Sequence, residues 1–584
     1  MTEETRRAAA RMSIASVGAI AGLAVWGLFE VVPDLIDNER SVMALIAFGL
    51  GFFGVLLALL GPIRLIPAGV ASGVCAAGAT LMLYWASFRH DDLGTFLDIS
   101  HSVAAFIYLL TVSVPFLAAG FVMPGGWRRY EILFDCAWNI VVRYAAAGLF
   151  VGVVWGVVML SDALLGLVGI TAIDWLLGFE PVPYLLSGLA LGLGLAIVHE
   201  LNDFVSPFLL IQLLRVLMPV LLVVLAIFIL ALPFRGLGAL FGQFSAATTL
   251  ASVAFAGITL ITTAIHRDDD LSVQGIGMLA TARILSVLVP VPAALALWAV
   301  WLRVDQYGLT PDRVVAMVAG AIVAIYAVGF GVAALIRGDW RRHQRNVNKG
   351  MALITLGGAA LWMTPVLNSE RLSTASQVAR AAAGAPISQL ALWEMAHKWG
   401  RAGEDGLDEI AALSDHPEAG ALKERIAQAR QETQRWTFMN AIDSETVRTL
   451  HGVVPVRPKG ASIPAGALDD LSPDMKRRTH MACAKTFEDG YPGCVMVVGR
   501  FEPLETTDQA ILILRRSASN FEQMALILRD GRFQQAGSVR DLVKRSYPRM
   551  NDAALLALLE DRFSIVPAPR NVLEVEGMQL FPQN

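Results

Sequence analysis

The ionisable residues best placed for chemistry follow apolar stretches near the middle of the chain. Residues 199–203 read His-Glu-Leu-Asn-Asp, and a helix would put His199 and Asp203 on one face with Glu200 turned about 100° away. Further polar residues stand at the ends of the next apolar stretches. Together they make a candidate polar cluster: His199, Glu200, Asp203, Arg215, Asp268, Asp270 and Arg283.

Two interpretations of this polar cluster are open. A cluster rich in carboxylate oxygens suits a Mg²⁺ ion that holds a phosphate group, as in transferases that act on lipid phosphates. The alternative is ordinary charge at a membrane interface, where Arg215 and Arg283 extend their heads to water. Because the three adjacent carboxylates of 268–270 cannot all face one ion, we favour the second interpretation and assign no metal.

Catalytic motifs are missing from the sequence. It has no phosphate-binding G-x-x-x-x-G-K-[ST] loop, no G-x-S-x-G, no H-E-x-x-H and no C-x-x-C pair. We therefore assign no catalytic residue and no cofactor. A basic stripe with interleaved aromatic residues is missing as well, so no nucleic acid is expected as a partner.

A second polar element lies between two apolar stretches. Residues 303–313 read Arg-Val-Asp-Gln-Tyr-Gly-Leu-Thr-Pro-Asp-Arg, and Thr310 followed by Pro311 is typical of a helix start. The flanking arginines could bind an anionic headgroup or an acidic protein patch, and a stabilised turn is the simpler interpretation, which we favour. This candidate outer-face element comprises Arg303, Tyr307, Gly308 and Arg313.

Composition indicates that membrane helices position these side chains. Of the 584 residues, 55% are apolar and only 16% are charged, with a mean hydropathy of +0.57, whereas soluble chains carry about 25% charged residues. Residues 371–584 hold 26 Lys/Arg and 27 Asp/Glu, so charge is concentrated there. The sequence predicts a polytopic α-helical membrane bundle in residues 1–370, followed by a soluble α+β domain. About eleven spans are expected, at 12–32, 42–60, 65–87, 102–122, 137–165, 183–199, 209–232, 247–265, 284–302, 314–336 and 350–367.

The distribution of Lys and Arg among the short loops predicts the orientation. Basic residues occupy the N-terminus and the loops after the second, fourth and tenth spans, so these should face the cytoplasm. An odd number of spans then places the C-terminal residues outside. The basic positions are Arg6, Arg7, Arg11, Arg64, Arg128, Arg129, Arg337, Arg341, Arg342, Arg345 and Lys349.

The part outside the cytoplasm reads as two segments. Residues 371–450 are expected to form helices. Residues 451–584 are expected to form a mixed α/β domain, with Asp530-Gly531 as a hairpin turn and Asn551 as a helix start. Cys483 and Cys494 enclose a short loop, and a disulfide between them suits an oxidising compartment. Two unrelated buried thiols are the alternative.

Several stretches resemble the bacterial membrane proteins grouped as domain-of-unknown-function family 4153. They are Gly166-Leu-Val-Gly-Ile170, the 303–313 element with its Tyr-Gly pair, and Ser376-Gln-Val-Ala-Arg380 before the Gly400-Arg401-Ala402-Gly403 turn. The resemblance covers about residues 140–410, and it departs from the family at Ser388-Gln389-Leu390, where members often have Phe-Asp. It implies a location in the bacterial inner membrane and brings no assigned reaction.

The leading functional interpretation is an inner-membrane protein with a periplasmic domain that binds, senses or scaffolds in the envelope. The expected partners are the lipid bilayer and an envelope protein or lipid that meets the outer domain. A small-molecule or lipid transporter is the second hypothesis, and it requires a polar cavity at mid-depth. A membrane-embedded transferase for a lipid-linked substrate is the third, and it requires Asp or His converging on a cavity open to lipid.

Overall fold

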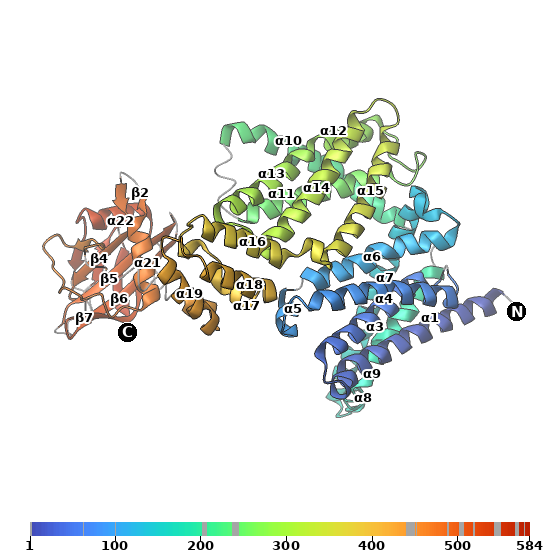
Figure 1. Cartoon of the computed structure of the whole chain (residues 1–584), viewed down its shortest axis with the longest axis horizontal. Coiled ribbons are helices and arrows are strands. Elements are labelled where there is room, and N and C mark those ends of the chain that lie inside the picture. Colours follow the sequence, from blue (N-terminus) through green and yellow to red (C-terminus); the bar gives the residue numbers. More distant parts are fainter. Residues whose placement is uncertain are drawn as a thin grey trace. The chain divides into compact units, whose positions relative to one another are not determined.

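A computed structural model describes residues 3–61, 63–99, 101–200, 207–235, 244–439, 450, 452–487, 490–501, 507–517, 520–541, 550–566, 572–576 and 578–583. The chain divides into two compact units, Met1–Ile426 and Ala427–Asn584. The first unit is helical, and the second contains the β-sheet (Figure 1).

The first unit is a bundle of long apolar helices. Over the described residues, ten candidate spans are long and apolar enough to cross a membrane, and an eleventh requires the segments Trp340–Trp362 and Pro365–Ala382, which meet at an 81° bend. The expected membrane bundle followed by an α+β domain is therefore confirmed. The helices are α1 (Glu3–Trp26), α2 (Val32–Leu35), α3 (Glu39–Leu59), α4 (Leu65–Ser87), α5 (Leu93–Ile99), α6 (His101–Val122), α7 (Tyr130–Leu167), α8 (Ala172–Leu177), α9 (Pro181–Glu200), α10 (Pro207–Arg235), α11 (Phe244–Ile265), α12 (Ile276–Leu288), α13 (Pro290–Tyr307), α14 (Pro311–Leu335) and α15 (Trp340–Trp362).

The bundle has two main hydrophobic cores. One joins α1, α3, α4, α6, α7 and α9, and the other joins α10 to α15. Helices α1 and α9 cross so closely that a Cβ added to Gly18, Gly22 or Gly188 would meet the backbone of the opposite helix. Gly188 and Gly192 thus allow close approach of the two helices, whereas Gly152 and Gly156 in α7 have open space around them.

Helix α15 begins earlier than its hydropathy indicates. The expected span started at residue 350, but the helix starts at Trp340, with Asp339 accepting a hydrogen bond from Arg342 N–H at its N-terminus. Its first turns carry polar side chains that are buried against the neighbouring helices, which an apolar-run criterion cannot detect. The basic stretch expected as a loop is therefore largely helical.

Short helices continue the first unit beyond α15. They pack with the membrane helices, so the unit extends to Ile426 rather than ending near residue 370. Arg401 N–H donates to the carbonyl of Arg89 at 3.0 Å, and Arg401 pairs with Asp91 at 2.8 Å. The helices are α16 (Ser369–Ala382), α17 (Leu392–His397), α18 (Gly400–Ala411) and α19 (Ala419–Gln431).

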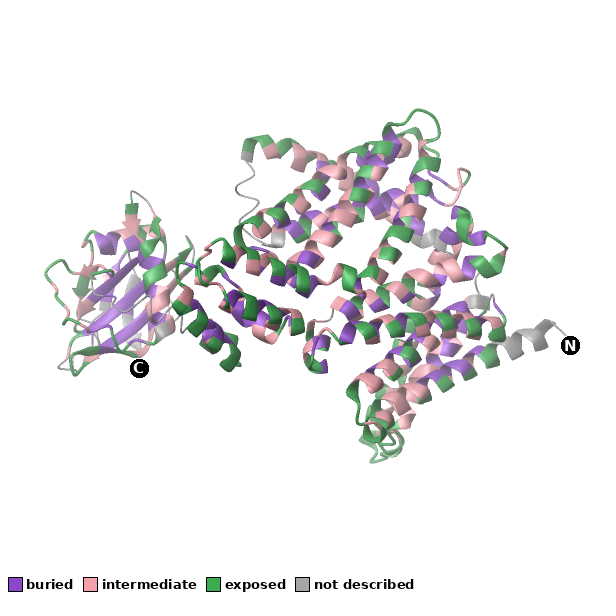
Figure 2. Ribbon diagram, viewed as in Figure 1, coloured by how far each residue is buried: buried purple, intermediate pink, exposed green. Residues whose placement is uncertain are grey.

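The second unit is built on one mixed sheet with strand order β1-β4-β5-β6-β7-β10-β9-β8. Alternate residues of β4 and β5 enter separate cores: Met496 and Leu512 on the side of α21, Val497 and Ile511 on the side of α22. The central strands are therefore buried on both faces (Figure 2). The elements are β1 (Val456–Arg457), α21 (Pro473–Ala484), β2 (Thr486–Phe487), β3 (Tyr491–Pro492), β4 (Cys494–Gly499), β5 (Gln509–Ser517), β6 (Asn520–Arg529), β7 (Arg532–Asp541), α22 (Asp552–Leu559), β8 (Ser564–Val566), β9 (Val572–Val575) and β10 (Met578–Gln583).

Local signals in this unit predicted its turns well. Asp530 and Gly531 join β6 to β7 with positive φ of 49° and 76°, as a tight hairpin requires. Asn551 accepts a hydrogen bond from Ala554 N–H at 2.9 Å and starts α22. Both predictions are confirmed.

Candidate functional site

The structure describes part of the candidate polar cluster. His199 and Glu200 end α9, but their side chains lie outside the described residues, and so does Asp203. The four remaining members lie where α10, α12 and the α11–α12 loop meet the first turns of α15. We call this end of the bundle the α15 end.

Arg215 of α10 is buried and bonded to backbone. It donates from Nε to the carbonyl of Thr263 at 2.9 Å and from Nη2 to the carbonyl of Leu271 at 2.7 Å. These acceptors belong to the last turn of α11 and the loop after it, whose carbonyls lack helical partners. Arg215 therefore holds the loop in place.

The carboxylates of the same loop are bound by arginines. Arg267 pairs with Asp268 at 3.1 Å and with Asp135 of α7 at 2.5 Å. Although partial burial raises it, the hydrogen bonds from Leu271 N–H and Arg267 lower the pKa of Asp268 below its usual value. Asp270 is exposed. In the described part of the chain, no group of three His, Cys, Asp or Glu residues could hold a metal ion.

His266 lies at the centre of this end. Its side chain is buried, its ring lies 4.9 Å from the Phe134 ring, and its backbone φ is +51°. Burial, with Arg215 as the next largest influence, lowers the pKa of His266 to about 4. The imidazole is therefore neutral near neutral pH.

Helix α15 supplies residues that the sequence analysis treated only as loop charges. Arg345 pairs with Asp269 at 2.7 Å and donates to the carbonyl of Ile265 at 2.9 Å. Gln344 donates to Ser286 at 2.8 Å, and Asn348 donates to Tyr130 at 2.9 Å. A pattern in the sequence could have revealed these residues: positions 341, 344, 345 and 348 have helical spacing, which puts four polar residues on one face of a helix.

Arg283 has a separate role. It donates from Nε to the carbonyl of Ala334 at 2.9 Å, near the end of α14. Arg215 and Arg283 therefore satisfy loop and helix-end carbonyls, and Asp268 pairs with Arg267. Arg215 is buried in this structural network and does not extend to water as expected, whereas Arg283 is exposed.

The outer-face element docks against α16 at the opposite end of the bundle, which we call the α16 end. Gly308 has φ of +75°, and Leu309 N–H donates to the Ser376 hydroxyl at 3.1 Å. Gln377 donates to the carbonyl of Leu309 at 3.1 Å, and Thr310 starts α14 as expected. Two of the stretches on which the family resemblance rests, 303–313 and 376–380, thus contact each other.

A second set of contacts fixes α16 to the bundle. Arg89 donates to the carbonyls of Trp362 and Thr364 at 2.7 and 2.8 Å, at the bend between α15 and α16, and lies 3.6 Å from Glu370. His101 of α6 pairs with Asp312 of α14 at 3.3 Å. These bonds replace the helical partners that the bend removes.

An apolar groove of about 1090 Å³ lies in the side of the bundle. It lies between α3, α6 and α7, and its walls include Leu50, Gly54, Leu110, Ile140 and Tyr144. Ligand pockets commonly enclose about 300–1,000 Å³, so the groove is large enough for a drug-sized or lipid-like molecule. Ile107, on its rim, is 57% exposed, so the groove is open sideways toward the expected lipid.

The charged side chains that line this groove lie at one end of it. Among its lining residues the ionised groups are the exposed Asp37 and Glu39, beside the start of α3. Further along the groove its lining carries two hydroxyl groups: Thr111 donates to the carbonyl of Ile107 and Tyr144 donates to the carbonyl of Gly54, both at 2.8 Å. The groove therefore suits a molecule with a long apolar part and a polar or cationic head.

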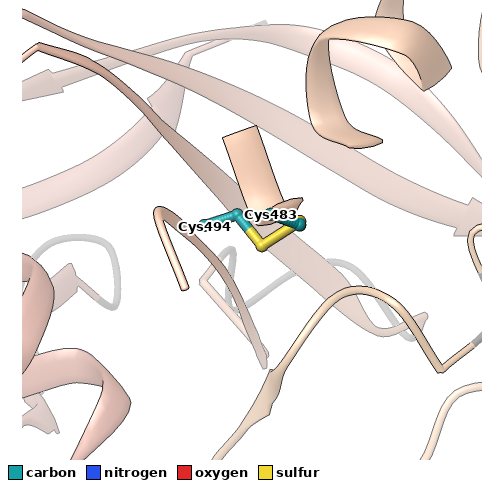
Figure 3. Close-up of a disulfide and its surroundings, with 2 residues drawn as sticks. All are labelled: Cys483 and Cys494. Carbon is teal, nitrogen blue, oxygen red and sulfur yellow. A yellow bond between two sulfur atoms is a disulfide. The ribbon is translucent and has the colours of Figure 1, made fainter. Parts of the chain in front are cut away.

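The second unit contains a disulfide between Cys483 and Cys494 (Figure 3). Their Cα atoms lie 4.8 Å apart, and the bond joins the end of α21 to the start of β4. It fastens the helix to the buried centre of the sheet. Large exposed apolar side chains on the described part of this unit are few: Trp436, Val453, Met481 and Ile565.

Comparison with known proteins identifies no relative. The chain matches no family model, and it has no significant similarity to any curated protein or solved structure.

Proposed function

We propose that this protein is a multi-pass inner-membrane protein that binds a lipid-like amphiphile in the groove between α3, α6 and α7. The α+β unit then lies in the periplasm, where it meets an envelope partner. Membership of family 4153 is part of the proposal and rests on the stretches quoted above.

The groove is the observation that carries this proposal. Its walls are mostly apolar and come largely from three candidate spans. Water inside the groove would lack hydrogen-bond partners, whereas an acyl chain needs none. Asp37 and Glu39 at its mouth favour an ammonium-bearing head over a phosphate alone.

The same features favour binding over transport or transfer. A transporter would place polar groups and broken helices around a cavity at mid-depth, but this groove has apolar walls. A transferase would place acid–base groups beside the bond that reacts, but the two carboxylates of the groove stand at its mouth. The bend between α15 and α16 belongs to the α16 end and lines neither wall of the groove.

The positions of the basic residues support the proposed orientation. Lys349 donates to the carbonyl of Arg128 at 3.2 Å, and Arg341 and Arg345 lie against the 266–270 loop, so basic stretches far apart in sequence share the α15 end. We place this end in the cytoplasm on the positive-inside rule. The α16 end is then periplasmic.

Filling the groove tests the proposed binding. Gly54→Leu adds a side chain into the groove at a position where an added Cβ meets nothing within 4 Å. Gly78→Leu makes the same change in α4, also with open space, away from the groove. We expect lipid retained by the full-length protein in a nonionic detergent, measured by mass spectrometry, to fall in Gly54→Leu alone. Equal retention by the wild type and both variants would refute the groove as the binding site.

A fusion tests the orientation. Alkaline phosphatase joined after Asn584 folds and is active only outside the cytoplasm, so we expect an active fusion. An inactive fusion with normal expression would place the α+β unit in the cytoplasm.

A further inference from the structure

Two arginines and a tyrosine form a compact group at the α16 end. The guanidinium carbons of Arg303 and Arg313 lie 6.0 and 5.6 Å from the centroid of the Tyr307 ring. Tyr307 ends α13 and Arg313 belongs to the first turn of α14, so the turn between these helices carries both positive charges. The ring stays 44% exposed.

Arg380 of α16 brings a third positive charge to this turn. It donates from Nη2 to the carbonyl of Gln306 at 3.2 Å and to the Gln389 side chain at 3.2 Å. A Cβ added at Gly308 would lie 2.6 Å from Arg380 Cδ, so the side chain crosses the turn in close contact. Both Arg303 and Arg380 repel Arg313 electrostatically.

Among the described residues, no carboxylate forms an ion pair with Arg313 or Arg380, although the neighbouring Asp312 attracts Arg313 electrostatically. Arg313 donates to the carbonyls of Gly308 and Tyr307, which are neutral, and Arg380 also donates only to neutral oxygens. The Nε of Arg380 is buried without any acceptor. The neighbouring carboxylate of Asp312 is paired with His101. A buried donor of this kind costs free energy unless a ligand or water supplies an acceptor.

Other arginines of the same unit show the contrast. Arg89 and Arg401 at this end are paired with Glu370 and Asp91, and Arg345 at the α15 end is paired with Asp269. Arg215 and Arg283 instead meet only neutral oxygens, so a carboxylate partner is common among these cations but not general. Arg313 and Arg380 form no ion pair with a carboxylate among the described residues, and they lie together beside an exposed aromatic ring.

Aromatic residues place this group at headgroup depth. Trp298 and Trp301 of α13 are each about half exposed, at 51% and 49%, and they precede Tyr307 by about two and a half and about one and two-thirds helical turns. Trp and Tyr gather where hydrocarbon meets the polar headgroups of a membrane. The phosphates of membrane lipids lie at that level.

We propose that Arg303, Arg313 and Arg380 form a binding site for a phosphate group beside Tyr307. Guanidinium groups match phosphate oxygens with paired hydrogen bonds, and the buried Nε of Arg380 gains its acceptor. The phosphate belongs to the headgroup of an anionic phospholipid or to a soluble phosphate. This site is separate from the groove, whose mouth is acidic, so either can fail without the other.

The test uses the full-length protein in a nonionic detergent. The Arg303→Gln/Arg380→Gln variant removes two charges and leaves Arg313, which also holds the Gly308 carbonyl. Arg371→Gln removes an exposed charge from the same helix as the control. Binding of phosphatidylglycerol, phosphatidylcholine and inorganic phosphate is measured by native mass spectrometry and calorimetry, and thermal unfolding shows whether each variant is folded.

We expect the double variant to bind the phosphate ligand about tenfold or more weakly, since it loses two of the three cations of the site. Arg371→Gln should bind like the wild type. Weaker binding in the phosphatidylglycerol arm assigns the site to a lipid headgroup, and weaker binding in the inorganic phosphate arm assigns it to a soluble phosphate. Unchanged affinity in both arms overturns the proposal. If the double variant is unfolded, the Arg303→Lys/Arg380→Lys variant, which keeps the charges, is tested in its place. If that variant binds phosphatidylglycerol and inorganic phosphate no more tightly than phosphatidylcholine, the proposal is also overturned.

Discussion

Arg345 and Asp269 form an ion pair of 2.7 Å that joins α15 to the loop between α11 and α12. The same guanidinium donates to the carbonyls of Ile265 and His266, at 2.9 and 3.3 Å. The buried Arg345 side chain therefore satisfies carbonyls at the end of α11 and holds the loop that follows in place. The polar residues of this end are bound to each other, so their first role is to hold six helices in register.

Replacing Arg345 should weaken this end of the bundle. Arg345→Met keeps the apolar stem but leaves two buried carbonyls unsatisfied and Asp269 with Arg341 as its remaining partner. We expect a loss of about 2–3 kcal/mol in the free energy of unfolding. Thermal unfolding of the detergent-solubilised protein measures it. Arg342→Met, at an exposed position of the same helix, is the control, and an equal effect of both changes would contradict the assigned role.

The stability of this end should depend on pH through His266. Its pKa lies near 4 in the folded protein, below the ordinary 6.5, because the buried ring faces Arg215, Arg267 and Arg345 with only Asp268 opposing them. The unfolded state therefore binds a proton first, and stability is complete above pH 6.5 and falls as pH decreases toward 4.

His266→Asn tests this dependence. Asparagine tolerates the positive φ of this position and does not titrate. The variant should lose less stability than the wild type between pH 6.5 and about 4. Exposed His343, changed to Asn, is the control. Identical pH profiles for the wild type and His266→Asn would show that another group is responsible.

The glycines of α9 and α7 should respond oppositely to the same substitution. Gly188→Ala puts a methyl group against the carbonyl oxygen of Gly18 in α1, so the helices must separate, at a cost of about 1–3 kcal/mol. Gly152→Ala meets nothing within 4 Å and should be neutral or stabilise the helix by up to about 1 kcal/mol. Unfolding in detergent compares them. Equal effects would mean that α1 and α9 do not pack closely.

The disulfide gives the second unit its own test. Cys483→Ser should remove a reduction-sensitive shift on a nonreducing gel and lower the stability of this unit by about 2–3 kcal/mol. Cys75→Ser, at a free cysteine of α4, should leave the shift in place. A shift that persists in Cys483→Ser would exclude the bond.

Sequence patterns predicted the elements whose cause is local. The apolar runs predicted the membrane helices, and Thr310, Asn551 and Asp530-Gly531 predicted two helix starts and a hairpin, because hydropathy, caps and turns depend on neighbouring residues. The start of α15 was predicted ten residues late, since its first turns are polar. Those residues are buried by contacts with α7, α11, α12 and α14, which no local pattern contains.

The amino-acid sequence by itself determined a membrane bundle followed by an α+β unit, since both follow from the apolar runs and the distribution of charge along the chain. Only the tertiary structure decided which distant groups each polar residue meets. Arg345 meets a carboxylate and two carbonyls from distant parts of the chain, whereas Arg215, Arg313 and Arg380 meet neutral oxygens. The groove likewise exists only where α3, α6 and α7 diverge, because a cavity is a property of the packing between helices and of no single one.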